Sequence, residues 1–204
     1  MNKRREFIKR AFDITFSGLS IILLSPLLLL VALAVRLSSR GSALFLQYRL
    51  GREGSSFTVY KFRTMFVNAP DIRNADGSAF NGTDDPRVTP LGRFLRRTSL
   101  DELPQLFNVF KGEMSLVGPR PDQVDQIRYY STDEHQKLMV KPGITGLAQI
   151  NGRNNISWEQ RKQLDLEYVR SQSTILDLRI LLQTIPYVLG QRDVFIAQTS
   201  EGLR

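Results

Sequence analysis

The sequence predicts an α+β protein that is mostly helical, with a helix–break–helix membrane segment at its N-terminus, a small β-hairpin and amphipathic helices suited to a membrane interface. Three observations give this fold class. The first is an uncharged apolar run over residues 14–35. The second is a pair of short strand-like segments around a glycine-rich turn, and the third is the helical spacing of apolar residues later in the chain. Together they divide the chain into a membrane segment, residues 1–40, and a second domain, residues 41–204.

The apolar run is long enough to reach across a bilayer. Its 22 residues would extend about 33 Å as a straight helix, and the hydrocarbon core is about 30 Å thick. Ser25 and Pro26 interrupt the run near its middle. A proline removes one helix hydrogen bond and favours a kink. Because lipid offers no water to the freed carbonyl, we expect the hydroxyl of Ser25 to help satisfy it.

Basic residues flank the run on both sides. They are Lys3, Arg4, Arg5, Lys9 and Arg10 before it, and Arg36 and Arg40 after it. Since Lys and Arg mark the cytoplasmic side of a membrane helix, both ends are expected in the cytoplasm. The pattern therefore favours a re-entrant hairpin over a kinked spanning helix, a secretory signal or a buried core helix. Asp13, at the start of the run, is expected to stay at the interface near Lys9 or Arg10.

Composition narrows the class of protein further. The chain has 204 residues, no cysteine and a formal net charge of +8. The lack of cysteine excludes disulfides, thiolate catalysis and Cys-ligated zinc. Residues 1–40 hold seven Lys/Arg and two Asp/Glu and so carry +5 of the net charge. Because this charge lies beside an apolar run, it favours anionic membrane lipids as partners. With no RNA-binding, zinc-finger or helix-turn-helix pattern, no nucleic-acid partner is expected.

The second domain is expected to begin with two strands and to continue in helices. The strands are predicted over residues 43–48 and 57–65, and in the second strand two cations alternate with two aromatic residues. Residues 68–86 contain Pro, Gly, Asn and Asp without periodicity, which predicts a long surface loop. Helices are expected to start near residues 90, 99, 158 and 175.

Two adjacent carboxylates, Asp101 and Glu102, lie among cations in the sequence. Those cations are Arg93, Arg96, Arg97, Lys111 and Arg120. Cations neutralise phosphate oxygens while a carboxylate attacks phosphorus or holds a divalent metal, so the pattern is typical of a reaction on a phosphate. The segment from Ser99 to Glu102 is also a good capping box. The residues alone therefore leave open a structural role for the pair, in a non-catalytic membrane adaptor.

Longer motifs extend through the chain. They are TPLGRFLRRTSLDELPQLFNV at residues 89–109, KGEMSLVGPRP at 111–121, KPGITG at 141–146, QINGRN at 149–154, YKFRTM at 60–65 and the Ser25-Pro26 pair. These motifs resemble the bacterial sugar transferases, the monotopic phosphoglycosyl transferases, over essentially the whole chain. The length is similar to that of the short, minimal-domain members. Leu147 stands where the family often has tryptophan, a change that touches no proposed catalytic group.

The resemblance implies a reaction and its partners. Such enzymes move a sugar 1-phosphate from a UDP-sugar to polyprenyl (undecaprenyl) phosphate, the first membrane step of glycoconjugate assembly. This takes place at the cytoplasmic face of the bacterial inner membrane. A glycosyltransferase that passes on the sugar alone and releases UDP is the alternative enzyme class.

The same resemblance implies roles for individual residues. Asp101 is the expected nucleophile on the β-phosphorus, which releases UMP and forms a phosphosugar-aspartyl intermediate. Glu102 is expected to hold Mg²⁺ together with Asp101, or to assist the second substrate. The expected substrate-binding residues are Lys61, Arg96, Arg120 and Asp165.

Overall fold

The computed structural model describes residues 3–73, 80, 82, 85–152 and 155–190. This part of the chain is α+β and mostly helical, as predicted. Its helices and strands are α1 (Lys3–Ser38), β1 (Leu44–Leu50), β2 (Ser56–Phe62), α2 (Pro90–Thr98), α3 (Gln105–Lys111), β3 (Ser115–Val117), β4 (Gly143–Thr145), α4 (Leu147–Ile150), α5 (Trp158–Ser171) and α6 (Thr174–Leu189). Its 3₁₀ helices are η1 (Arg52–Gly54), η2 (Leu100–Glu102), η3 (Val124–Tyr129) and η4 (Glu134–Met139).

Two small sheets form part of the framework. β1 and β2 make the predicted antiparallel hairpin, in which Leu44 lies opposite Phe62 and Leu50 opposite Ser56. β3 and β4 pair in parallel, and the sequence analysis did not anticipate this second sheet. Parts of the predicted loop and of the motif at residues 149–154, namely residues 74–79, 81, 83–84 and 153–154, lie outside the described residues.

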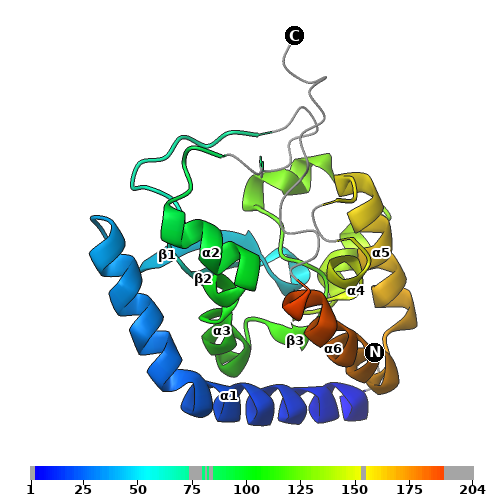
Figure 1. The fold of residues 1–204 in the computed structure, drawn as a ribbon. Helices are drawn as coiled ribbons and strands as arrows, with labels where there is room; N and C mark the ends of the chain where they lie inside the picture. The colour runs from blue at the N-terminus through cyan, green and yellow to red at the C-terminus, as the bar shows by residue number, and fades with distance from the viewer. Residues whose placement is uncertain (1–2, 74–79, 81, 83–84, 153–154, 191–204) are drawn as a thin grey trace.

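Helix α1 bends, so that its two arms enclose one side of the domain (Figure 1). Pro26 lies inside the helix. The Ser25 hydroxyl donates a 2.8 Å hydrogen bond to the carbonyl oxygen of Ile22. In an α-helix this carbonyl would accept from the amide of residue 26. The expected role of Ser25 in satisfying the kink is therefore confirmed.

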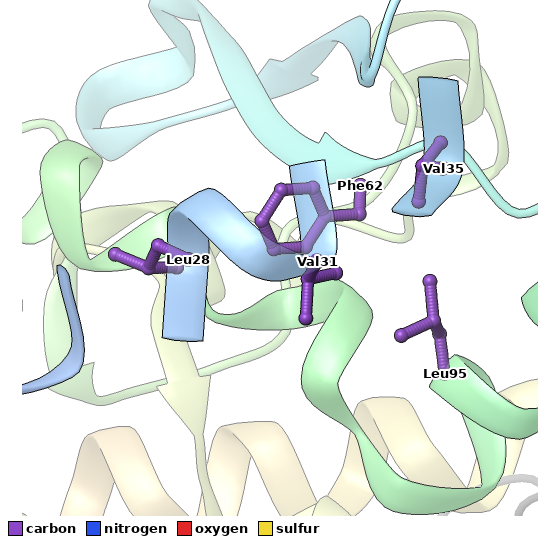
Figure 2. Close-up of a cluster of buried hydrophobic side chains, with 5 residues drawn as sticks. All are labelled: Leu28, Val31, Val35, Phe62 and Leu95. Carbon is purple, nitrogen blue, oxygen red and sulfur yellow. The ribbon is translucent and has the colours of Figure 1, made fainter. Parts of the chain in front are cut away.

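The second arm of α1 contributes to the hydrophobic core. Figure 2 shows Leu28, Val31 and Val35 gathered with Phe62 of β2 and Leu95 of α2. The end of α1 is held by Arg63, which donates through Nη1 to the Ser39 hydroxyl at 2.6 Å and through Nε to the Ser42 carbonyl at 2.7 Å. The division of the chain at residue 40 stays a prediction, but α1 clearly packs as part of the fold.

The first arm of α1 is anchored by a buried acid. Asp13 is only 2% exposed, and its Oδ1 accepts from the Ser115 hydroxyl at 3.1 Å and the Leu116 amide at 3.0 Å. Asp13 does lie near Lys9 and Arg10, as expected, and its position at the membrane interface stays a prediction. Partners on β3, about a hundred residues later in the chain, hold it inside the protein.

The apolar run leaves most of its surface uncovered. In the 18-residue window that marks α1 as a candidate membrane span, 11% is buried, so α1 is not the buried core helix of the alternative interpretation. Exposed apolar residues line both arms: Phe7, Ile8, Ile14, Phe16, Leu19, Ile22, Leu23, Leu29, Leu30, Leu33 and Leu37. Among the described residues α1 alone is long and apolar enough to cross a membrane. The re-entrant path with both ends in the cytoplasm stays a prediction.

Candidate active site

A tight turn between α2 and α3 places Asp101 and Glu102. Ser99 adopts a left-handed conformation with φ of 57° and ends α2, because its amide donates to the Arg96 carbonyl at 3.1 Å. η2 follows, and α3 begins only at Gln105. The Ser99 side chain makes no cap hydrogen bond. The capping box predicted at Ser99 is therefore wrong, so the two acids do not belong to a helix cap of that kind.

Glu102 joins two distant segments. Its Oε1 accepts from Lys61 Nζ at 2.9 Å and from an Arg120 amine at 3.0 Å. Lys61 lies on β2, and Arg120 follows β3. Burial lowers the pKa of Lys61, while Glu102 acts to raise it. Glu102 is also the main cause of a raised pKa at Arg120. One carboxylate thus compensates two cations in a half-buried site, and Asp101 is the next residue along the chain.

Arg96 approaches the same site from α2. Its Nε donates to the Thr64 hydroxyl at 3.0 Å, just beyond β2. Burial lowers the pKa of Arg96, and Asp101 is the strongest opposing charge. The close approach of α2 requires glycine at position 92, since an added Cβ would overlap the Thr64 carbonyl. The predicted cap at the start of this helix is confirmed, because Thr89 accepts from the Gly92 amide at 2.9 Å.

Asn108 fixes the strand that carries Lys61. It is fully buried on α3. Its side chain accepts from the Tyr60 amide at 3.0 Å and donates to the Thr58 carbonyl at 2.7 Å. The amide group therefore binds the β2 backbone much as a neighbouring strand would. This links the helix after the Asp101 turn directly to the residue preceding Lys61.

Asp165 lies in a separate cluster of buried charges. It is 0% exposed on α5 and pairs with Lys137 Nζ at 2.8 Å. Lys137 also pairs with Asp122 at 2.6 Å, and Asp122 accepts from the Tyr130 hydroxyl at 2.6 Å. Burial raises the pKa of Asp165 against the pull of Lys137. Burial has the same tendency at Asp122, but Lys137 and Arg161 bring the pKa of Asp122 well below its usual range.

The structure thus brings four of the five predicted polar partners of Asp101 into one site: Glu102, Lys61, Arg96 and Arg120. Asp165 contacts Lys137 rather than Asp101 or Glu102. Its role in substrate binding stays a prediction. The buried cluster that contains Asp165 also contains Asp122, which lies two residues after Arg120. The cluster therefore stabilises the turn that carries Arg120.

The sequence as a whole matches a known family. The model of the bacterial sugar transferase family matches residues 4–191. The chain belongs to this family. The resemblance of the motifs is therefore confirmed.

Three relatives illustrate the range of the bacterial sugar transferases. The undecaprenyl-phosphate glucose phosphotransferase of Komagataeibacter xylinus is 46% identical over 200 residues, which cover 92% of this chain and 37% of the relative. The undecaprenyl-phosphate galactose phosphotransferase of Salmonella typhimurium is 42% identical over 194 residues, covering 90% and 40%. The uncharacterized sugar transferase EpsL of Bacillus subtilis is 46% identical over 182 residues, covering 89% and 87%. The chain spans about two fifths of the first two relatives and most of the third.

One further cation of this member of the bacterial sugar transferase family was missed by the sequence analysis. Arg49 on β1 donates to the Pro121 carbonyl at 3.3 Å, beside Arg120. Burial lowers its pKa to about 10; the charge of Arg120 adds to the shift, while those of Asp122 and Glu102 oppose it. A single arginine in a strand carries no pattern in the sequence, and only the pairing of distant segments reveals its position.

The acid pair fits a magnesium ion. Among the described residues no group of three or more His, Cys, Asp or Glu side chains could hold a metal. Magnesium, however, is commonly bound by one or two carboxylates together with substrate phosphates and water. Asp101 and Glu102 supply such a pair, next to cations that suit a diphosphate. The two carboxylates therefore suit a magnesium ion whose remaining ligands are phosphate oxygens and water.

Proposed function

We propose that this chain transfers a sugar 1-phosphate from a UDP-sugar to polyprenyl phosphate, at the cytoplasmic face of a bacterial membrane. The observation that carries the proposal is the geometry of the Asp101–Glu102 turn. Both acids are 8% exposed, and Glu102 is held by Lys61 and Arg120. The relatives from Komagataeibacter and Salmonella are named as undecaprenyl-phosphate sugar phosphotransferases, which supports the same reaction class.

The proposed chemistry has two displacement steps at one phosphorus atom. A carboxylate oxygen of Asp101 attacks the β-phosphorus of the UDP-sugar, and the bond from that phosphorus to the bridging oxygen breaks. UMP leaves with the bridging oxygen, and a phosphosugar-aspartyl intermediate forms. A phosphate oxygen of polyprenyl phosphate then attacks the same phosphorus. This releases the Asp101 carboxylate and gives polyprenyl-diphosphate-sugar.

The cations have a defined part in this scheme. Phosphoryl transfer depends mainly on positioning and on neutralising the oxygens of the transferred group. Lys61, Arg96 and Arg120 approach the acid pair from β2, α2 and the turn after β3. They bind and orient the diphosphate, and they offset the repulsion between it and the ionised acids. Glu102 holds two of these cations at a common oxygen, so it sets their spacing before substrate arrives.

Magnesium is proposed as the cofactor, held by Asp101 and Glu102. When bound, it would neutralise charge on the phosphate oxygens of the UDP-sugar and of the departing UMP. The residues of the chain bind and orient the substrate around it.

The membrane segment is proposed to bring the site to its lipid substrate. The exposed apolar surface of both arms of α1 suits insertion into lipid. A re-entrant path places residues 3 and 40 on the same face, and basic residues at both ends are attracted to anionic headgroups. The catalytic turn would then face both a soluble nucleotide-sugar and a membrane-bound phosphate.

The released nucleotide tests the proposal. Purified full-length protein in membranes that contain polyprenyl phosphate is incubated with a panel of UDP-sugars, and nucleotide products are separated by chromatography. UMP with at least one sugar is the expected product. UDP would instead support a transferase that passes on the sugar alone, and no nucleotide with any sugar would favour the membrane adaptor. Mass spectrometry of the protein without acceptor should find the phosphosugar adduct on Asp101.

A further inference from the structure

A cavity lies at the start of α1 and shares no residue with the candidate active site. Its volume is about 170 Å³. Since a single water needs only about 10–15 Å³ of such volume, the cavity has room for a polyatomic ion with its water. The lining residues are Arg5, Glu6, Lys9, Arg10, Asp13, Arg52, Ser115, Val140, Lys141 and Gln172.

Positive charge exceeds negative charge around this cavity. Five of its lining residues are Lys or Arg, and two are acids. Lys9 pairs with Asp177 at 2.7 Å, and Arg52 pairs with Glu6 at 3.1 Å. Asp13 is bound to Ser115 and Leu116. Among the described residues the other three cations, Arg5, Arg10 and Lys141, form no ion pair with an acid within 4 Å, although Asp13 and Glu6 lie near Lys141.

All three cations line the cavity, and their other contacts are as follows. One terminal nitrogen of Arg5 is buried and has no hydrogen-bond partner among the described residues. Arg10 donates to the Val109 and Phe110 carbonyls at 2.6 and 2.7 Å, at the end of α3. An added Cβ at Gly112 would lie 3.0 Å from Arg10 Nη2 and 3.5 Å from Lys141 Nζ, so these two cations converge on the same glycine.

The lowered pKa of Lys141 is consistent with burial and with other positive charges nearby. Burial lowers its pKa, and the nearby charge of Arg10 lowers it further. Asp13 acts in the opposite direction but is already held by two hydrogen-bond donors of its own. A buried donor left unpaired and clustered cations are both unfavourable in a folded protein unless an anion is bound. A phosphate group offers several oxygens to guanidinium and ammonium donors at once.

We propose that this cavity is a binding site for a phosphate group, distinct from the candidate active site. It is formed by Arg5, Arg10 and Lys141, where α1 meets α3 and the segment before β4. The cavity lies a few residues before the apolar run begins at residue 14. This is the level at which lipid headgroups surround a membrane helix. The phosphate could belong to an anionic phospholipid or be free in solution, and the chemistry of recognition is the same.

Two parallel titrations of the full-length protein test the site and distinguish the sources. In neutral detergent, inorganic phosphate is added and its binding is followed by calorimetry and by the thermal unfolding midpoint. In lipid nanodiscs, phosphatidylcholine alone is compared with phosphatidylcholine containing phosphatidylglycerol. A ligand that binds the folded state raises the unfolding midpoint. A response to inorganic phosphate identifies a soluble ligand, and a response to phosphatidylglycerol alone identifies a headgroup.

Matched variants separate a built site from diffuse surface charge. Arg5→Gln/Lys141→Gln removes two charges from the cavity, and Arg128→Gln/Arg170→Gln removes two exposed charges outside it and away from α1. The cavity variant should weaken binding by roughly tenfold or more, and the control should keep the wild-type response. If the cavity variant does not fold, Lys141→Gln alone is compared with Lys141→Arg, which should retain binding.

The proposal is overturned if neither ligand stabilises the wild-type protein, or if cavity and control variants lose the response equally. None of these measurements uses turnover. The test of the phosphate site is therefore independent of the test of the proposed transferase reaction.

Discussion

Ser25 donates a hydrogen bond of 2.8 Å to the carbonyl oxygen of Ile22, one turn back along α1. Pro26 has no amide hydrogen, so it cannot bind this carbonyl as another residue would. The residue that supplies the missing hydrogen bond is thus the neighbour of the residue that removes it. In lipid an unsatisfied carbonyl is costly because no water can replace the partner. The Ser25-Pro26 pair is therefore a unit that permits a bend inside an apolar environment.

Replacing Ser25 by alanine should destabilise the folded protein in lipid by about 1 kcal/mol, because the Ile22 carbonyl loses its donor. The measurement is thermal unfolding in nanodiscs. Ser38→Ala is the matched control, since Ser38 makes a similar bond to Val35 at 3.0 Å without a proline beside it. Equal losses in the two variants would contradict the role assigned to Ser25, and Ser25→Thr should restore most of the stability.

Replacing Asp101 by asparagine should abolish transfer while leaving the fold nearly intact. The amide keeps the shape of the side chain but cannot attack phosphorus, so turnover should fall on the order of 10⁴-fold or more. Release of UMP is the measured quantity, and circular dichroism with thermal unfolding reports the fold. The control is Asp125→Asn, which removes a surface acid paired with Arg73 at 2.6 Å and should leave turnover unchanged. If Asp101→Asn retained its activity, Asp101 could not be the nucleophile.

The ion pair of Lys61 with Glu102 predicts how the rate depends on alkaline pH. Burial lowers the pKa of Lys61, so Lys61 loses its proton at a lower pH than lysine in water, whose pKa is about 10.4. Once the pH rises above the lowered pKa of Lys61, this side chain is neutral. Glu102 then keeps Arg120 as its one cationic partner of the two. We expect turnover to fall as pH rises, with a midpoint below that of free lysine.

A variant series assigns this alkaline limb. Lys61→Arg keeps its charge throughout the range and should move the limb to higher pH. Lys111→Arg changes an exposed lysine that pairs with Glu113 at 2.9 Å, and it should not move the limb. If the limb stays in place in Lys61→Arg, another group is responsible for it.

Local patterns in the sequence were enough to predict the hairpin of β1 and β2 and the start of α2 at its Thr89 cap. Each depends on residues that are close together in the chain. The capping box at Ser99 failed because that residue takes a left-handed conformation, and the chain turns twice before α3 begins. A four-residue motif does not reveal where the next helix starts.

Long-range pairing explains what the sequence did not reveal. The burial of Asp13 depends on Ser115, and the position of Arg49 depends on the turn after β3. The three-residue strands β3 and β4 are too short to show a period of two. In each case the deciding contact joins segments far apart in the chain, and composition and spacing carry no information about it.

Asn108 links α3 to the strand that carries Lys61, and its loss should affect stability and activity together. Asn108→Ala removes the bonds to Thr58 and Tyr60 and leaves their buried backbone groups unpaired. We expect a loss of about 2–3 kcal/mol in the free energy of unfolding, with lower turnover because Lys61 is displaced. Asn151→Ala is the control: its side chain donates to the Leu147 carbonyl at 2.8 Å on the exposed surface, and it should cost less than 1 kcal/mol. Equal costs would contradict the bridging role.

The re-entrant path of α1 can be tested by labelling, because the chain has no cysteine of its own. Single cysteines are introduced as Lys3→Cys, Arg40→Cys and, as a marker for the side of the domain, Glu53→Cys. Glu53 is a suitable marker because its side chain is 78% exposed. In sealed inverted membrane vesicles, a maleimide that cannot cross the membrane should label all three positions, since both ends of the segment and the domain face the cytoplasm. In intact spheroplasts it should label none until detergent is added. Labelling of Lys3→Cys and Arg40→Cys from opposite sides would show that α1 spans the bilayer.

In Pro26→Ala the restored amide favours a straighter helix, so this variant should shift labelling toward that spanning pattern. If Pro26→Ala keeps the wild-type pattern, the basic flanks alone are sufficient to hold both ends on one face.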